Sequence, residues 1–195
     1  MGAVGAMVNL IQRVAGFFAR FRDDQGAAIT LELAFAVPVL ATLLMSGVDL
    51  TRYVLINQKL ERTAATMGDL ISRMPELTEG DITSLFGASD QTMIPYDLRA
   101  EGHVIISSIA PVSGTAEVVW QRDHGLVPAA SRYGDSGNPA VLPAGFVVRD
   151  NENVITAEVF YDFKPILLTG VMNAQRLYSS ALFRPRFGNL TSVLP

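Results

Sequence analysis

A single carboxylate, that of Glu32, stands inside the most apolar part of the chain. It is the only charged residue between Asp24 and Asp49, and the stretch from Leu33 to Val48 carries no charge at all. Holding a carboxylate in such a segment within lipid costs about 3 kcal/mol, so the residue is usually paired or functional. Two interpretations are open: an interfacial glutamate that reaches the membrane surface, or one half of an ion pair.

The other half of such a pair can be made by proteolysis. Gly26 follows a charged patch, and the apolar helix is predicted to begin directly after it. A cut after Gly26 leaves a new ammonium group a few residues before Glu32. In a packed assembly the ammonium of one subunit can neutralise Glu32 of the next, which is tolerable only if both charges find partners. The candidate processing and assembly residues are therefore Gly26, Ala27, Ala28 and Glu32.

The apolar segment predicts one membrane-spanning helix. About 20 apolar residues, rising about 1.5 Å each, cross a hydrocarbon core, and residues 27–49 have that length. A buried core helix is seldom apolar on every face over this distance. A cleaved signal peptide is disfavoured because the small-residue pattern AFA at 34–36 lies early in the run instead of following it. Pro38 lies inside the helix and predicts a tolerated kink.

Arginines favour a cytoplasmic N-terminus for this helix. Arg13, Arg20 and Arg22 precede the span, and positive residues before a first span tend to stay in the cytoplasm. Cations from Arg52 onward follow the span and moderate this signal. Residues 8–22 fit either a basic amphipathic helix on the membrane surface or an unstructured leader. The expected topology is a single span with a cytoplasmic N-terminus and an exported C-terminal domain.

The helix is predicted to continue beyond the membrane as an amphipathic helix. One apolar stripe recurs at steps of three and four residues: Tyr53, Ile56, Leu60, Ala64, Met67, Ile71 and Met74. Pro75 ends the run. A second helix is predicted at 79–86, with Thr78 as its cap, Asp81 three residues later and Gly87 at its end.

The remaining chain changes to the period of two that is typical of strands. Strands are predicted at 103–110 and 115–121, joined by a PVSG turn, at 155–163, and at 177–183. In the second of them Ala116, Val118 and Trp120 are expected to share one face. The intervening segment 123–153 is rich in Gly, Pro, Ser and Asp and predicts a long loop with a short strand at 146–149.

These elements predict an α+β fold. A long N-terminal helix, half transmembrane and half exported, is expected to pack on a small antiparallel sheet. The predicted divisions are a cytoplasmic leader (1–26), a transmembrane helix (27–49), its exported continuation (50–75) and a periplasmic α+β domain (76–195).

The sequence gives no sign of a catalytic, cofactor or metal site. His103 and His124 are the only histidines, in no metal-binding spacing, and the chain has no cysteine. Phosphate-binding, nucleophile-elbow and dinucleotide-binding motifs are missing. Glu158 and Asp162 are expected on a solvated sheet face. A net charge of −4 without a basic stripe argues against nucleic acid as a partner.

Two C-terminal features allow more than one interpretation. Arg176, Arg184 and Arg186 form a small basic cluster in the sequence, for which a solvated surface is expected. The apolar run PILLTGVM at 165–172 fits either an interaction patch or core packing.

The region around Gly26 resembles the processing region of class III prepilins, and most closely that of the TadE-like family. The shared pattern is a charged leader, a glycine, small residues and a glutamate in an apolar helix interrupted by proline, seen here as RDDQGAAITLE (22–32) running into LAFAVPVL. Further matching pieces bring the resemblance to roughly residues 20–190: RTAATMGDLISR (62–73), PYDL (95–98), Trp120, LPAGF (142–146), ITAEVFYDFKPIL (155–167) and FRPR (183–186).

One departure is the spacing, because the family places glutamate fifth after the cleaved glycine and Glu32 is sixth after Gly26. Either the cut falls after Ala27, or the spacing is relaxed, or the chain is not processed.

The resemblance implies a pilin-like architecture and a minor pseudopilin, anchored in the bacterial inner membrane by a single span with its C-terminal domain in the periplasm. Such a protein takes part in assembling a tight-adherence (Flp-type) pilus; its role is structural and not catalytic, and it has no cofactor. The partners it implies are membrane lipid, major and minor pilins, the pilus assembly platform and a prepilin peptidase. Two alternatives stay open. A single-pass membrane-anchored periplasmic binding module unrelated to pili would have no reason to carry Gly26 and Glu32 in this arrangement. A membrane-tethered hydrolase would need a catalytic constellation, of which the sequence gives no hint.

Overall fold

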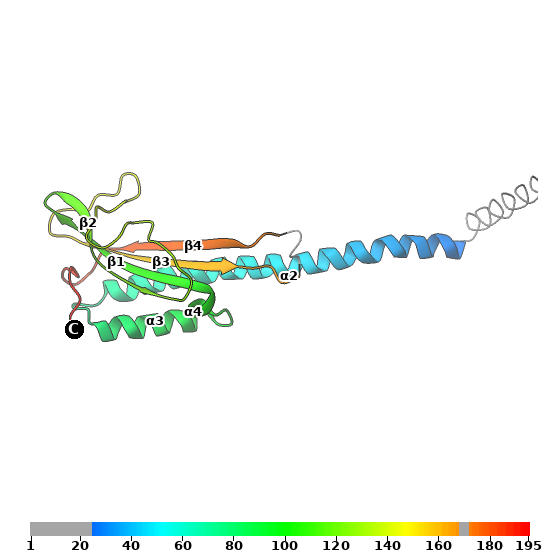
Figure 1. Ribbon diagram of the computed structural model, residues 1–195, viewed down its shortest axis with the longest axis horizontal. Coiled ribbons are helices and arrows are strands. Elements are labelled where there is room, and N and C mark those ends of the chain that lie inside the picture. The colour runs from blue at the N-terminus through cyan, green and yellow to red at the C-terminus, as the bar shows by residue number, and fades with distance from the viewer. Residues whose placement is uncertain (1–24, 168–171) are drawn as a thin grey trace, which may run out of the picture. The chain divides into compact units, whose positions relative to one another are not determined.

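The computed structural model describes residues 25–167 and 172–195. Within these residues, three helices are followed by four strands, in the order α2 (Gln25–Ser72), α3 (Glu79–Met93), α4 (Leu98–Glu101), β1 (Gly102–Val112), β2 (Thr115–His124), β3 (Val154–Phe163) and β4 (Gln175–Phe183). The predicted α+β fold, a long N-terminal helix followed by a small antiparallel sheet, is confirmed (Figure 1). The predicted leader, including residues 8–22, falls largely outside the described residues. The chain divides into two compact units between Val48 and Asp49.

The part of α2 in the first unit is apolar on every side. Large side chains are exposed all along it, for example Leu33 at 55%, Phe35 at 70% and Leu44 at 74%. Among the described residues, α2 is the one helix long and apolar enough to cross a membrane, with a mean hydropathy of 2.1 over its most apolar window. A helix suits such a segment because its backbone groups are satisfied internally, as lipid requires.

In the second unit, α2 becomes amphipathic, as its periodicity predicts. Its apolar stripe is buried, with Ile56, Leu60, Ala64 and Ile71 fully enclosed and Met67 only 1% exposed. The helix ends at Ser72, three residues before Pro75, which cannot continue a helix. The helix is expected to end near Met74, and this end is confirmed to within two residues; at its other side α2 is already helical at Gln25, the first described residue.

Helix α3 starts as predicted but does not end where the sequence suggested. The Thr78 side chain accepts from the Asp81 backbone N–H, and the Asp81 carboxylate accepts from Thr78 N–H, which completes a capping box. The predicted end at Gly87 is wrong, because α3 continues to Met93. The cost of a glycine inside a helix, about 1 kcal/mol, is offset by burial of Met93 beyond it.

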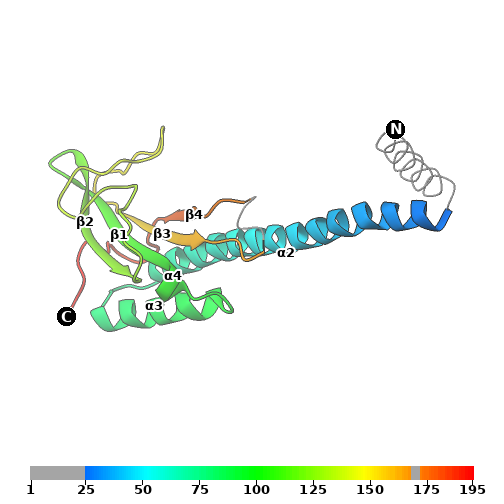
Figure 2. The same ribbon diagram turned by 45° about the vertical axis from the view of Figure 1, so that its right-hand side comes forward.

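The sheet is antiparallel throughout, in the order β2-β1-β3-β4. The turn between β1 and β2 is formed by Ser113 and Gly114, whose φ angles of 52° and 85° are both positive, as a tight two-residue hairpin turn requires. Figures 1 and 2 show α3 and the second-unit part of α2 on the same face of this sheet. The clean alternation predicted for β3 is confirmed, because Ile155, Ala157 and Val159 all join the main core against these helices.

A bulge in β2 overturns the predicted side-chain faces of that strand. Ser108 pairs with Trp120 but Ile109 pairs with Val118, so Val119 is an extra residue. Such an insertion reverses the alternation on either side of it. Trp120 therefore packs in the main core, while Val118 and Ala116 pack in a second cluster with Ile109 on the opposite face.

The long loop between β2 and β3 covers this opposite face. Tyr133 is 7% exposed and completes the second cluster, against which Ala140, Leu142 and Val148 also pack. The predicted strand at 146–149 is wrong, because these residues form no strand. Burial of almost every residue of β1 follows from this cover, since both faces of the strand are enclosed.

Candidate functional site

The four predicted processing and assembly residues, Gly26, Ala27, Ala28 and Glu32, lie on the first turns of α2. Gly26, Ala28 and Glu32 are exposed. Within the described part of the chain, no hydrogen bond or ion pair reaches the Glu32 carboxylate. Nothing described in a single copy of the chain therefore compensates this charge.

Other polar side chains of the candidate membrane span form hydrogen bonds within their own helix. The hydroxyl of Thr30 donates to the carbonyl of Gly26, that of Thr42 to Pro38, and that of Ser46 to Thr42, at 2.7–2.8 Å. These bonds to the carbonyl four residues earlier let a hydroxyl enter lipid without an orphan donor. Pro38 lies inside α2, which continues on both sides of it; the predicted kink stays a prediction.

Asp49 is a buried carboxylate whose role the sequence did not indicate. Its side chain is fully buried, and its two oxygens accept from the backbone N–H groups of Ile166 and Leu167 at 3.0 and 2.9 Å. The Arg52 guanidinium lies 3.5 Å from the same carboxylate and donates to the Lys164 carbonyl. Asp49 thus fixes the chain that leaves β3 onto the first turn of α2 in the second unit. The only signal in the sequence was a charge placed directly after an apolar run.

Glu158 is a second buried carboxylate, and its expected position on a solvated face is wrong. The residue is 0% exposed because the loop between β2 and β3 covers it. Its carboxylate accepts from the Ser131 hydroxyl, from the Arg132 backbone N–H at 2.9 Å and from the Tyr178 hydroxyl at 2.9 Å. Glu158 therefore ties this loop to the sheet.

The environment of Tyr178 keeps its hydroxyl protonated, so that it remains a hydrogen-bond donor to Glu158. Burial, together with the nearby Glu158 carboxylate, raises the pKa of the Tyr178 phenol above its ordinary value, so it keeps its proton. The Arg132 guanidinium lies 3.7 Å from the centre of the Tyr178 ring and supplies a nearby positive charge. Three donors from the loop and from β4 share the two carboxylate oxygens, so the cluster has a structural role.

The histidines serve local structure. His103 Nε2 lies 3.3 Å from an Asp123 carboxylate oxygen, and His124 Nε2 lies 3.0 Å from one of Asp90, with the Phe86 ring stacked on its other side at 5.1 Å. Across residues 25–167 and 172–195, no group of three or more His, Asp or Glu side chains is placed to hold a metal ion.

The three C-terminal arginines do not form one basic patch. Each lies beside a different carboxylate: Arg176 beside Asp162 at 2.6 Å, Arg186 beside Asp69 at 3.4 Å, and Arg184 beside Glu152 at 3.8 Å. The Arg176 guanidinium lowers the pKa of the Asp162 carboxyl by hydrogen bonding. The pairs are partly exposed, so they contribute little to stability.

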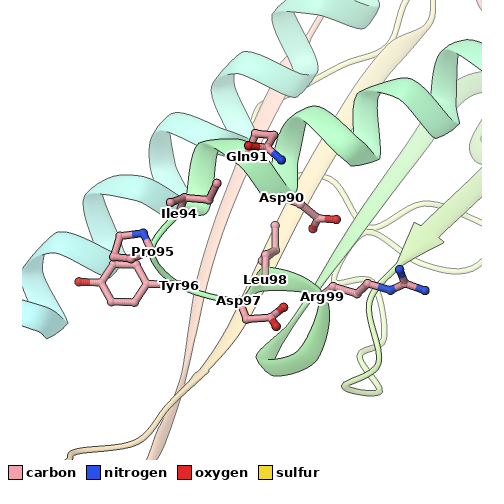
Figure 3. Close-up of a pocket in the computed structure, with 8 residues that line it drawn as sticks. All are labelled: Asp90, Gln91, Ile94, Pro95, Tyr96, Asp97, Leu98 and Arg99. Atoms are coloured by element: carbon pink, nitrogen blue, oxygen red, sulfur yellow. The ribbon is translucent and has the colours of Figure 1, made fainter.

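A shallow depression of about 360 Å³ lies between α3 and α4 (Figure 3). Two of its acidic side chains have structural partners: Asp97 caps α4 by accepting from Ala100 N–H, and Asp90 Oδ2 lies 3.0 Å from His124 Nε2, while Asp90 Oδ1 is buried without a hydrogen bond. The side chains of Tyr96 and Arg99 point in opposite directions. These groups do not converge on a common point, as a binding or catalytic site requires.

Comparisons with protein-family models, with curated proteins and with solved structures give no match for this chain. The resemblance to the TadE-like family stays a prediction from the sequence.

Proposed function

We propose that this protein is a TadE-like minor pseudopilin, anchored in the bacterial inner membrane by α2, that takes part structurally in assembling a tight-adherence pilus. The observation that carries the proposal is Glu32, an exposed carboxylate on an apolar helix without a partner among the residues described. A charge that one chain leaves uncompensated in lipid calls for a second subunit. The proposed partners are pilins, the assembly platform and a prepilin peptidase, besides lipid.

Helix geometry relates the site of processing to the kind of pairing. A mature chain that starts at Ala28 has Glu32 four residues on, on the same face of the helix as its own ammonium group. A chain that starts at Ala27 has Glu32 five residues on, rotated by about 140° at 3.6 residues per turn. A cut after Gly26 therefore favours pairing between subunits, whereas a cut after Ala27 also allows pairing within one chain.

Processing is tested by sequencing the N-terminus of protein extracted from membranes. We expect a mature chain that starts at Ala27 or Ala28. Gly26→Leu should block the cut, because the peptidase must approach the backbone closely at this position. Gly47→Leu is the matched control, since a side chain at Gly47 meets open space further along the same helix. Native protein that keeps Met1 would rule out maturation and leave a simple signal-anchored protein.

The proposed orientation is tested with a reporter fused after Pro195. Arginines before the span predict an exported C-terminus, so a reporter that is active only in the periplasm should work there. The same fusion with a reporter that is active only in the cytoplasm should be silent. Activity of the cytoplasmic reporter would reverse the assigned topology.

A further inference from the structure

The chain that leaves β3 carries an apolar tip, Ile166 and Leu167, whose backbone is held in place. Ile166 and Leu167 are 62% and 43% exposed, although both belong to the large aliphatic class that usually packs inside. Their backbone N–H groups are the donors to the buried Asp49 carboxylate. The backbone of this tip is therefore held in place while its two side chains face outward.

The position of Asp49 in the chain indicates what covers these side chains. Asp49 directly follows the apolar part of α2. Residues 28–48 of a helix rise about 31 Å at about 1.5 Å per residue, and a hydrocarbon core is about 30 Å thick. If α2 is the membrane anchor, Asp49 lies where the helix leaves the hydrocarbon. Groups hydrogen-bonded to Asp49 then lie at the membrane surface.

The charges beside the tip fit the headgroups of a bilayer. Lys164 is exposed, and the Arg52 side chain is 24% exposed between Asp49 and the Phe163 ring. Cations at this depth contact lipid phosphates while neighbouring apolar side chains enter the acyl boundary. Two aliphatic side chains flanked by two cations therefore match a phospholipid surface better than they match water.

We infer that Ile166 and Leu167 insert into the outer leaflet of the inner membrane, with Arg52 and Lys164 on its phosphates, so that the second unit makes its own contact with lipid. The inference rests on the proposed membrane anchoring by α2. Lipid contact at this tip, besides the helix, would restrict rotation of the second unit about the membrane normal.

The test uses the full chain in vesicles of phosphatidylethanolamine and phosphatidylglycerol. Because the chain has no cysteine, Ile166→Cys provides a single site for an environment-sensitive fluorophore. The Ile166 side chain is 62% exposed and belongs to neither hydrophobic cluster, so the substitution should leave the fold intact. We expect several-fold less quenching by iodide in water than at Val141→Cys, together with quenching by a nitroxide on the lipid near its headgroup. Leu167→Cys should give the same result.

The two reference sites separate the possible failures. Val141 is 67% exposed and follows Ala140, which bonds to Ala116 at the end of the sheet remote from Phe163. Leu44→Cys reports on the anchor itself. If the label at Leu44 is in lipid but the label at Ile166 is as open to iodide as the label at Val141, the inferred lipid contact of the tip is wrong and the membrane anchor stands. Shielding of the Ile166 label from iodide without quenching by the lipid nitroxide would assign the tip to a protein partner. That result would also overturn the inferred lipid contact. A label at Leu44 that is open to water overturns both the anchor and this inference.

Discussion

Glu32→Ala is expected to abolish assembly while leaving insertion intact. Removing a carboxylate from an apolar helix favours partitioning into lipid by up to about 3 kcal/mol. In the proposed assembly, however, the substitution leaves the ammonium group of a neighbouring subunit buried without its partner. Breaking a buried pair from one side costs about 3–5 kcal/mol, which is on the order of a hundred- to several thousand-fold in association. The measurement is co-purification with pilins from membranes, set beside the total amount of inserted protein.

Two further variants separate charge from polarity at this position. Glu32→Gln should be intermediate, because its amide accepts a hydrogen bond but carries no charge. Thr30→Val is the matched control, since it removes a hydroxyl two residues away that donates to the Gly26 carbonyl of its own helix. If Glu32→Ala inserts and still binds its partners normally, Glu32 is an interfacial residue and the pairing is wrong. The interpretation also requires cleavage, because an unprocessed chain has no ammonium group next to the span.

The sequence predicted those elements whose side chains follow one period without interruption. The stripe from Ile56 to Ile71 and the alternation in β3 repeat over several turns or residues, so each indicates its buried face directly. The failures have local causes. The inserted residue Val119 reverses the faces of β2, and burial of Met93 carries α3 past Gly87. The periodicity of a short segment shows neither an inserted residue nor the free energy gained by burying a side chain further along the helix.

The two structural carboxylates were hidden from sequence reasoning because their partners are backbone groups or distant residues. Asp49 binds N–H groups more than 110 positions away, and those of Ile166 and Leu167 carry no signature of this role. Glu158 alternates with the apolar residues of β3, and this pattern predicted that its side chain faces solvent. What buries it is a loop without secondary structure, and periodicity does not predict where such a loop packs. Glu32, in contrast, was evident because its surroundings are uniformly apolar.

Glu158→Ala is expected to be the most destabilising change on the face of the sheet that the loop between β2 and β3 covers. It leaves Ser131, the Arg132 backbone N–H and Tyr178 without their shared acceptor, whose own residue is 0% exposed. Orphaned buried donors cost about 1–3 kcal/mol each and are not additive, so we expect a total of about 3–5 kcal/mol. For a unit of this size that lowers the melting temperature by on the order of 10 °C. Trp120, the only tryptophan and 5% exposed, is a native fluorescence probe for the full chain in detergent.

Asp162→Ala is the matched control, because Asp162 lies on the same strand and face but pairs with Arg176 near the surface. That variant should lose less than about 1 kcal/mol. Limited trypsin digestion gives a second readout, since a released loop should be cut after Arg132 much faster in Glu158→Ala than in either the native chain or the control. Glu158→Gln should lie between them, because its amide oxygen can still accept from Arg132 and Tyr178. Melting of Glu158→Ala within about 2 °C of the native chain, with no faster cleavage, would mean that the apolar contacts of Tyr133 and its neighbours hold the loop without the carboxylate.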